Sequence, residues 1–263
     1  MASGVTGPTR ASIPDRTLRS DRWWLEPLLT FVVFSGFVVF ATYRAFLGRD
    51  FYVEPYMSPF FSPCITADCT DKSALPIVFE WWKLSPALVI LIFPLGFRMT
   101  CYYYRKAYYR AFWLSPPACA VAEPHSAYSG ETRLPLILNN MHRYFWYGAM
   151  VVAAFLTFET ILAFGPMEGE DPGIHMGLGT VLFVVNSVLI WLYTLSCHSC
   201  RHIVGGRLRT FSKHPVRYRM WTWVSRLNAK HSTYAWYSLF SVAAVDFYVY
   251  LLATDRISDL RFF

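Results

Sequence analysis

The chain has 263 residues, of which 55% are apolar and 16% charged, and its formal net charge is +7. Soluble domains carry about a quarter charged residues, so this composition argues against an ordinary soluble enzyme. Basic chains can bind nucleic acid, but here the basic residues flank long apolar runs and form no single soluble patch. The composition therefore predicts an integral membrane protein in contact with the lipid bilayer and argues against nucleic acid as a partner.

Several apolar stretches approach the length of about 20 residues that a membrane-spanning helix needs. In chain order the predicted spans cover residues 25–46, 75–97, 144–164, 176–195 and 234–253. In the second span Glu80 and Lys83 interrupt the apolar run, but their i,i+3 spacing lets them pair, and Pro94 predicts a kink. The expected fold class is an all-α membrane protein, a bundle of about five transmembrane helices.

The distribution of lysine and arginine predicts the orientation, because cytoplasmic segments are enriched in both. Eighteen of the 24 basic residues fall in the N-terminal segment and in two loops, 98–143 and 197–231. We therefore expect a cytoplasmic segment over residues 1–22 and a single five-helix transmembrane domain over 23–263, with the C-terminus outside. The polar, arginine-bearing start does not resemble a cleavable signal peptide. The expected location is a bacterial plasma membrane.

The six cysteines divide between the two sides of this predicted topology. Cys64 and Cys69 lie in an outer loop, where a disulfide closing a short loop is the ordinary interpretation. The other four, Cys101, Cys119, Cys197 and Cys200, fall on the cytoplasmic side, where disulfides are rare. Cys197 and Cys200 are spaced i,i+3 at the end of the fourth span, which predicts that both thiols lie on one helix face and can reach one centre.

Histidine shows the same bias toward the predicted cytoplasmic side. Six of the seven histidines lie there, and His142 and His231 open the third and fifth spans. A lone buried cysteine is usually a small apolar residue. Cysteines and histidines gathered at several helix ends at one membrane depth are better explained by a metal site.

Three metal sites are compatible with these residues. Four Cys and His ligands can hold zinc, which would fit a transporter-like membrane protein with a zinc site. A haem b needs inward-facing axial histidines, and His142 and His231 could supply one such pair. Two Cys and two His could hold a Rieske-like [2Fe–2S] cluster, whose imidazole ligands raise its reduction potential. A membrane scaffold without a redox centre is a further alternative.

Four sequence runs resemble the single-chain membrane anchor of an actinobacterial-type succinate dehydrogenase. They are Met99–Arg110, Pro116–Ala120, Asn140–Tyr144 and Ser196–His202. The resemblance implies a subunit that docks the flavoprotein and iron–sulfur subunits on its cytoplasmic face and passes electrons to menaquinone or ubiquinone. It also implies a Rieske-like [2Fe–2S] cluster in place of haem, and a possible higher oligomer of the complex.

The resemblance leaves more candidate ligands than a cluster needs. Cys197 and Cys200 rank first as thiolates, ahead of Cys101 and Cys119, and His142 and His231 rank ahead of His202. For the quinone, which needs an apolar slot with a few hydrogen-bonding groups, the cytoplasmic rim offers a set of aromatic and basic candidates. These candidates are Trp113, Tyr144, Trp146, Trp223 and Arg226.

Three polar residues lie inside the predicted spans. Glu159 and Asp246 fall toward the outer ends of their spans, so we expect both at a solvated surface, with a proton path from an outer quinone as the alternative. Asn186 lies in mid-span and is expected to hydrogen-bond to a neighbouring helix.

Overall fold

The structure is a computed structural model of the whole chain, and it describes residues 20–62, 86–101, 104, 121, 132–134 and 136–263, with the side chains of 86–90 left out. Eight helices and one short hairpin make up this part. In chain order the elements are α1 (Leu25–Leu47), β1 (Tyr52–Val53), β2 (Tyr56–Met57), α2 (Pro86–Thr100), the 3-10 helix η3 (Leu136–Met141), α4 (His142–Leu162), α5 (Leu178–Leu195), α6 (His198–Gly205), α7 (Pro215–Asn228) and α8 (His231–Ala253).

Four of the described helices are long and apolar enough to cross a membrane: α1, the continuous η3–α4 stretch, α5 and α8. This confirms the all-α membrane class. α2 has 15 residues in the structure, and the start predicted for its span lies outside the described residues. The count of five spans and the orientation of the termini therefore remain predictions.

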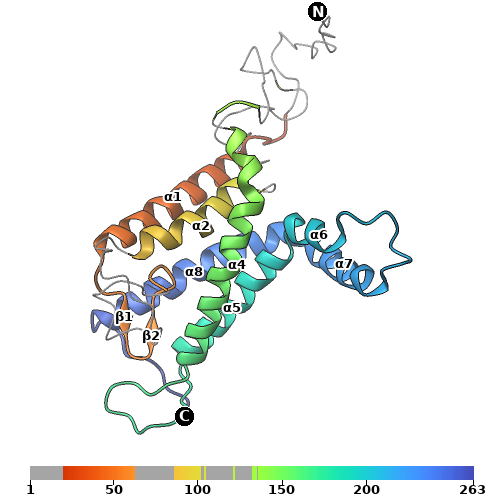
Figure 1. Cartoon of the computed structure of the whole chain (residues 1–263). Coiled ribbons are helices and arrows are strands. Elements are labelled where there is room, and N and C mark those ends of the chain that lie inside the picture. Colours follow the sequence, from red (N-terminus) through yellow and green to blue (C-terminus); the bar gives the residue numbers. More distant parts are fainter. Residues whose placement is uncertain (1–19, 63–85, 102–103, 105–120, 122–131, 135) are drawn as a thin grey trace, which may run out of the picture.

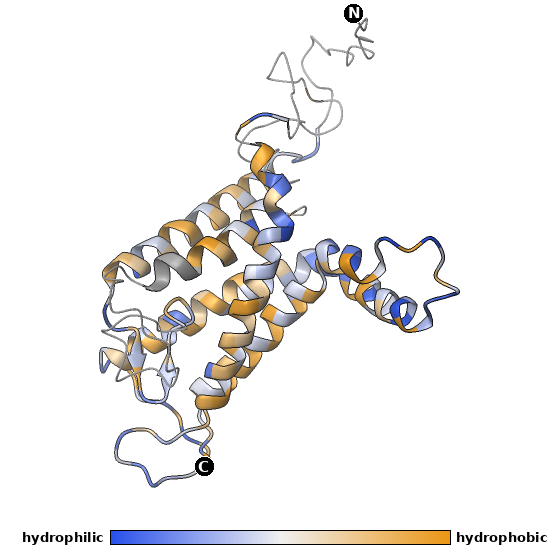
Figure 2. Ribbon diagram, in the orientation of Figure 1, coloured by the Kyte–Doolittle hydropathy of each residue, from blue (hydrophilic) through white to orange (hydrophobic). Residues whose placement is uncertain are grey.

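The long helices pack side by side, whereas α6 and α7 project from the bundle as an arm (Figure 1). We call the part of the bundle next to α6 and α7 the arm end. The opposite part, which carries the β1–β2 hairpin and the C-terminus, is the hairpin end. The helix surfaces are largely apolar (Figure 2), and exposed side chains such as Val39 and Phe46 on α1 suit contact with lipid.

α2 and α4 approach closely because a phenylalanine of each helix packs against a glycine of the other. Phe145 of α4 lies over Gly96 of α2, and Phe93 of α2 lies over Gly148 of α4, with no room for a β-carbon at either glycine. Small residues permit this kind of close helix packing in membranes. The contact fixes the ends of α2 and α4 relative to each other at the arm end.

A Gly148→Leu variant should be less stable by about 1–3 kcal/mol, because the added side chain collides with Phe93 in a packed interface. The measurement is the thermal denaturation of the purified, detergent-solubilised protein. Gly36→Leu on α1 is the matched control, since a β-carbon there meets no atom within 4 Å among the described residues. Equal denaturation temperatures for the two variants would contradict this description of the interface.

At the hairpin end, the C-terminal segment is held against the bundle by polar contacts. Arg261 pairs with Gly177 in an isolated bridge and donates from Nη2 to Glu170 Oε2 at 2.6 Å. This hydrogen bond holds the pKa of the Glu170 carboxyl below its usual range. The Tyr56 hydroxyl donates to Asp259 Oδ2 at 2.7 Å, so the hairpin joins the same network.

Two acidic residues contradict the expectation of a solvated surface. Glu159 and Asp246 are 4% and 0% exposed, because the segment after β2 covers them at the hairpin end. Asp246 is paired with Arg44 of α1, whose Nε donates to Oδ2 at 2.8 Å. Asn186, expected to hydrogen-bond to a neighbouring helix, is buried, and its Oδ1 accepts no hydrogen bond from the described residues.

Candidate metal centre

Four cysteine and histidine side chains meet at the arm end, each from a different helix terminus. Cys101 follows α2, His142 opens α4, Cys197 lies between α5 and α6, and His231 opens α8. His142 Nε2 lies 3.1 Å from Cys197 Sγ, and His231 Nε2 lies 3.2 Å from Cys101 Sγ. All four side chains are buried, each with at most 8% of its surface exposed. The group thus presents two sulfur and two nitrogen donors away from solvent.

Both imidazoles are oriented by hydroxyl groups on the ring nitrogen that faces away from the sulfur. Thr100 Oγ1 lies 2.9 Å from His142 Nδ1, and Ser196 Oγ lies 2.7 Å from His231 Nδ1. Such a partner on one ring nitrogen fixes the tautomer and leaves the other nitrogen for a metal. The two rings also stack on aromatic side chains, His142 on Phe97 and His231 on Tyr193.

A fifth donor, His198, was not selected from the sequence. Its ring stacks on His142 with centroids 5.4 Å apart, and the donor atoms of His142, Cys197 and His198 all lie within 4.8 Å of one another. His198 is exposed, unlike the other four. Its position directly after Cys197 is the signal that could have identified it.

The chain changes direction at Cys197, which separates this residue from Cys200. α5 ends at Leu195, Cys197 is extended (φ −64°, ψ 143°), and its Sγ accepts a hydrogen bond from the Ser199 N–H as the N-cap of α6. The i,i+3 argument assumed one continuous helix, so it does not apply here. Cys200 is buried in α6. Like Cys101 and His231, it is outside the set of described donors that all lie within 4.8 Å of one another. Unlike Cys101, which lies 3.2 Å from His231 Nε2, it makes no hydrogen bond to His142 or His231 among the described residues.

Of the remaining predicted ligands, His202 is exposed and contacts Arg143. Its Nδ1 lies 2.8 Å from Arg143 Nη2 at an exposed position. Cys119 lies outside the described residues, as do Cys64 and Cys69 of the predicted disulfide.

Burial affects the charge of the thiols. It raises the pKa of the Cys197 thiol above its usual range, and the neighbouring Cys101 raises that pKa further. A buried thiolate pair is unfavourable unless a cation compensates it, and metal binding supplies that compensation by displacing the protons. The donor types, their burial and their oriented imidazoles therefore fit a metal centre with mixed sulfur and nitrogen ligands.

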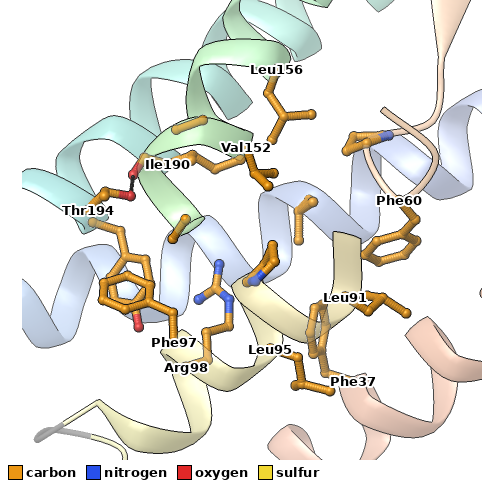
Figure 3. A pocket seen from close by; sticks show the side chains of 16 residues that line it. Phe37, Phe60, Leu91, Leu95, Phe97, Arg98, Val152, Leu156, Ile190 and Thr194 are labelled. Carbon is orange, nitrogen blue, oxygen red and sulfur yellow. Dashed lines mark hydrogen bonds between the residues drawn. The ribbon is translucent and has the colours of Figure 1, made fainter. Parts of the chain in front are cut away.

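An apolar cavity lies next to this group, between α1, α2, α4, α5 and α8. Figure 3 shows the side chains that line it, with the Arg98 guanidinium among apolar neighbours. Arg98, which the sequence assigned to a cytoplasmic loop, is buried in α2 and donates from Nη1 to the Ala235 carbonyl at 3.0 Å. Its guanidinium lies 4.7 Å from the centre of the Tyr193 ring, which stacks on His231.

Of the predicted quinone-binding residues, the four that the structure describes do not line this cavity. Trp146 is buried and donates from Nε1 to the Thr194 carbonyl at 2.9 Å, while Tyr144 is 69% exposed. Trp223 and Arg226 are exposed on α7, and Trp113 lies outside the described residues. The predicted residues are aromatic and basic side chains of the membrane boundary, whereas the cavity lies between the helices of the bundle.

Comparisons with known proteins give concordant results. The profile of the family described as actinobacterial succinate dehydrogenase subunit SdhC matches residues 25–255. A chain of the solved structure "Mycobacterium smegmatis Sdh1 complex in the apo form" is 51% identical to this chain, with a TM-score of 0.86 and 100% of both chains covered. The search of curated proteins found no match.

Proposed function

The chain belongs to the family of actinobacterial succinate dehydrogenase SdhC subunits, a membrane anchor of that complex, and on this basis we propose that it holds a Rieske-like [2Fe–2S] cluster and passes electrons from its partner subunits to a membrane quinone. The proposed ligands are Cys101, Cys197, His142 and His231. The observation that carries the proposal is the buried group of two thiols and two hydroxyl-oriented imidazoles at the arm end.

The donor set favours such a cluster over the alternatives. A Rieske-type centre has two cysteine and two histidine ligands, the same types and numbers that meet here. Haem ligation would need an open space between two imidazoles, but each Nε2 here is within 3.2 Å of a thiol sulfur. Zinc accepts the same four donors, but it has no redox chemistry and would leave an electron-transfer subunit without its carrier.

A bound cluster would supply one-electron redox chemistry, and the protein side chains set its surroundings. Thr100 and Ser196 hold the imidazoles with Nε2 toward the sulfurs, and burial excludes water. The Arg98 charge lies within the bundle close to His231, where it would favour negative charge on a group held there.

We propose that the adjacent cavity binds the quinone, in place of the exposed boundary residues. A quinone needs an apolar slot with a few polar groups near its carbonyl oxygens. The polar side chains of the lining are Arg98, Tyr193 and Thr194, and the Thr194 hydroxyl already donates to the Ile190 carbonyl at 2.7 Å. The Tyr193 hydroxyl is buried and makes no hydrogen bond with the described residues, so it can donate to a quinone carbonyl.

Filling the cavity should impair quinone reduction and leave succinate oxidation intact. In an Ala153→Phe variant the new ring occupies the cavity, which should weaken quinone binding by about 1–3 kcal/mol, or roughly fivefold to a hundredfold. The measurement compares succinate-driven reduction of quinone with reduction of a soluble dye by the intact complex. Ala154→Phe is the control, because Ala154 is exposed on the same helix. Equal quinone KM values for the two variants would place the quinone elsewhere.

A further inference from the structure

A buried carboxyl group lies at the end of the bundle opposite the metal centre. Glu159 is seventeen residues beyond His142 on α4, which is about 25 Å along the helix axis. It is only 4% exposed. An ionisable side chain buried in a membrane bundle is costly, and such residues commonly mark a path for ions or protons.

The neighbours of Glu159 do not neutralise it. Its carboxyl lies beside the Ser62 hydroxyl, which is buried and makes no hydrogen bond of good geometry within the described part of the chain. The other covered acids among the described residues at the hairpin end are both paired, Asp246 on α8 with Arg44 of α1 and Asp259 with Arg261. Among the described residues, no ion pair includes Glu159. Glu159 is therefore the acid that can gain and lose a proton without breaking an ion pair.

Glu159 also lies between the cavity and the surface of the hairpin end. Val152, Leu156 and Glu159 follow one another on one face of α4, and the first two line the cavity (Figure 3). On the other side lies Tyr52 of β1, which is partly exposed. Burial raises the pKa of Tyr52, and the carboxylates of Glu54 and Glu159 raise it further, which places Glu159 within electrostatic reach of the hairpin.

We propose that Glu159 carries protons from the hairpin end of the bundle to the quinone in the cavity, an inference that rests on the proposed quinone-reductase function. Oxidation of succinate to fumarate by the partner subunits releases two electrons and two protons on the arm side. Reduction of the quinone to quinol consumes two electrons from the arm side and two protons, which enter through Glu159. The reaction is then balanced, with its two protons taken up on the opposite side from those released.

With electrons and protons entering the cavity from opposite ends of the bundle, quinone reduction moves net charge across the membrane. Electrons move from the arm end toward the cavity, and protons move from the hairpin end toward the same cavity. Both movements transfer positive charge from the hairpin side to the arm side. With the hairpin end outside, as the lysine and arginine distribution predicts, a membrane potential that is positive outside accelerates quinone reduction.

The test uses the intact complex reconstituted in liposomes with quinone, a trapped pH-sensitive dye, and valinomycin with potassium to remove the membrane potential. External succinate drives only complexes whose catalytic subunits face outward, so their hairpin end faces the lumen. We expect the lumen to become alkaline as quinone is reduced. An unchanged lumenal pH during quinone reduction overturns the inference.

Substitutions at position 159 test whether Glu159 is the group that carries the protons. Glu159→Gln should slow quinone reduction at least about tenfold, since a positioned acid commonly contributes this much or more, while the iron–sulfur signal and dye reduction remain. Glu159→Asp, which keeps a titratable group, should restore most of the rate, and Glu26→Gln at the exposed start of α1 should match the wild type. A wild-type rate in Glu159→Gln, or an Asp variant as slow as the Gln variant, overturns the inference. A wild-type complex that reduces the dye but no quinone contradicts the proposed function itself.

Discussion

Complexes that carry Cys101→Ser or Cys197→Ser lose succinate-driven quinone reduction by more than about a hundredfold, beyond the loss usual for residues that only support a metal ligand. Each serine removes one sulfur from the buried donor set, and each sulfur lies within 3.2 Å of an imidazole nitrogen. Reduction of a soluble dye by the catalytic subunits should continue at the wild-type rate. The measurement is the ratio of the quinone rate to the dye rate for each purified complex.

Cys200→Ser is the matched control for this pair. Cys200 is buried near the same helix break but, unlike Cys101 and Cys197, makes no hydrogen bond to His142 or His231 among the described residues. We therefore expect nearly full quinone reduction from this variant. Loss of activity in Cys200→Ser, with activity retained in Cys101→Ser, would instead support the thiolate pair Cys197 and Cys200 that the sequence ranked first.

An Asp246→Asn variant is less stable than the wild type by about 3–5 kcal/mol, because it leaves the Arg44 guanidinium buried without its counter-charge. Arg44 Nε donates to Asp246 Oδ2 at 2.8 Å, and the Ser58 hydroxyl donates to Oδ1 at 2.5 Å. Arg44 and Asp246 come from α1 and α8, so the ion pair joins two helices that are distant in sequence. Thermal denaturation of the detergent-solubilised protein measures this decrease in stability relative to the wild type.

Two further variants separate the ion pair from the general effect of removing charge. The double variant Arg44→Met/Asp246→Leu should recover most of the lost stability, because neither buried charge remains. Arg49→Gln breaks the exposed pair of Arg49 and Asp50, which are 3.6 Å apart, and should cost less than about 1 kcal/mol. A double variant as unstable as Asp246→Asn would contradict the role given to the ion pair.

The elements of the fold that could be predicted are those defined by a local run of apolar residues. The first and fourth spans were predicted at 25–46 and 176–195, and the structure has Leu25–Leu47 and Leu178–Leu195. An apolar run of about 20 residues is nearly sufficient to define such a helix. The end of α2 at Thr100 and the start of α4 at His142 were harder to predict, because both carry polar residues that pack against other helices.

The candidate site shows the limit of arguments from spacing. Helix termini at one membrane depth were enough to bring Cys101, His142, Cys197 and His231 together as candidates. Spacing did not show that the chain turns at Ser196 and Cys197, which separates Cys200 from the two imidazoles and places His198 beside His142.

The buried charges were misassigned for a related reason. Arg98 was counted with the basic residues of a loop, and Glu159 was placed at a solvated surface. In the structure Arg98 donates to Ala235 and Ser238 of α8, and Glu159 is covered near Ser62. The partners that permit burial are distant in the sequence, so a count of charges along the chain does not reveal them.

Iron analysis and electron paramagnetic resonance of the purified complex test the central claim most directly. The partner subunits carry iron of their own, so the comparison is between the wild-type complex and one with Cys101→Ser and Cys197→Ser together. The wild type should hold about two more irons per complex, as one [2Fe–2S] cluster requires, and should show a Rieske-like signal that the variant lacks. Equal iron contents and identical spectra, or zinc in place of the extra iron, would contradict the claim.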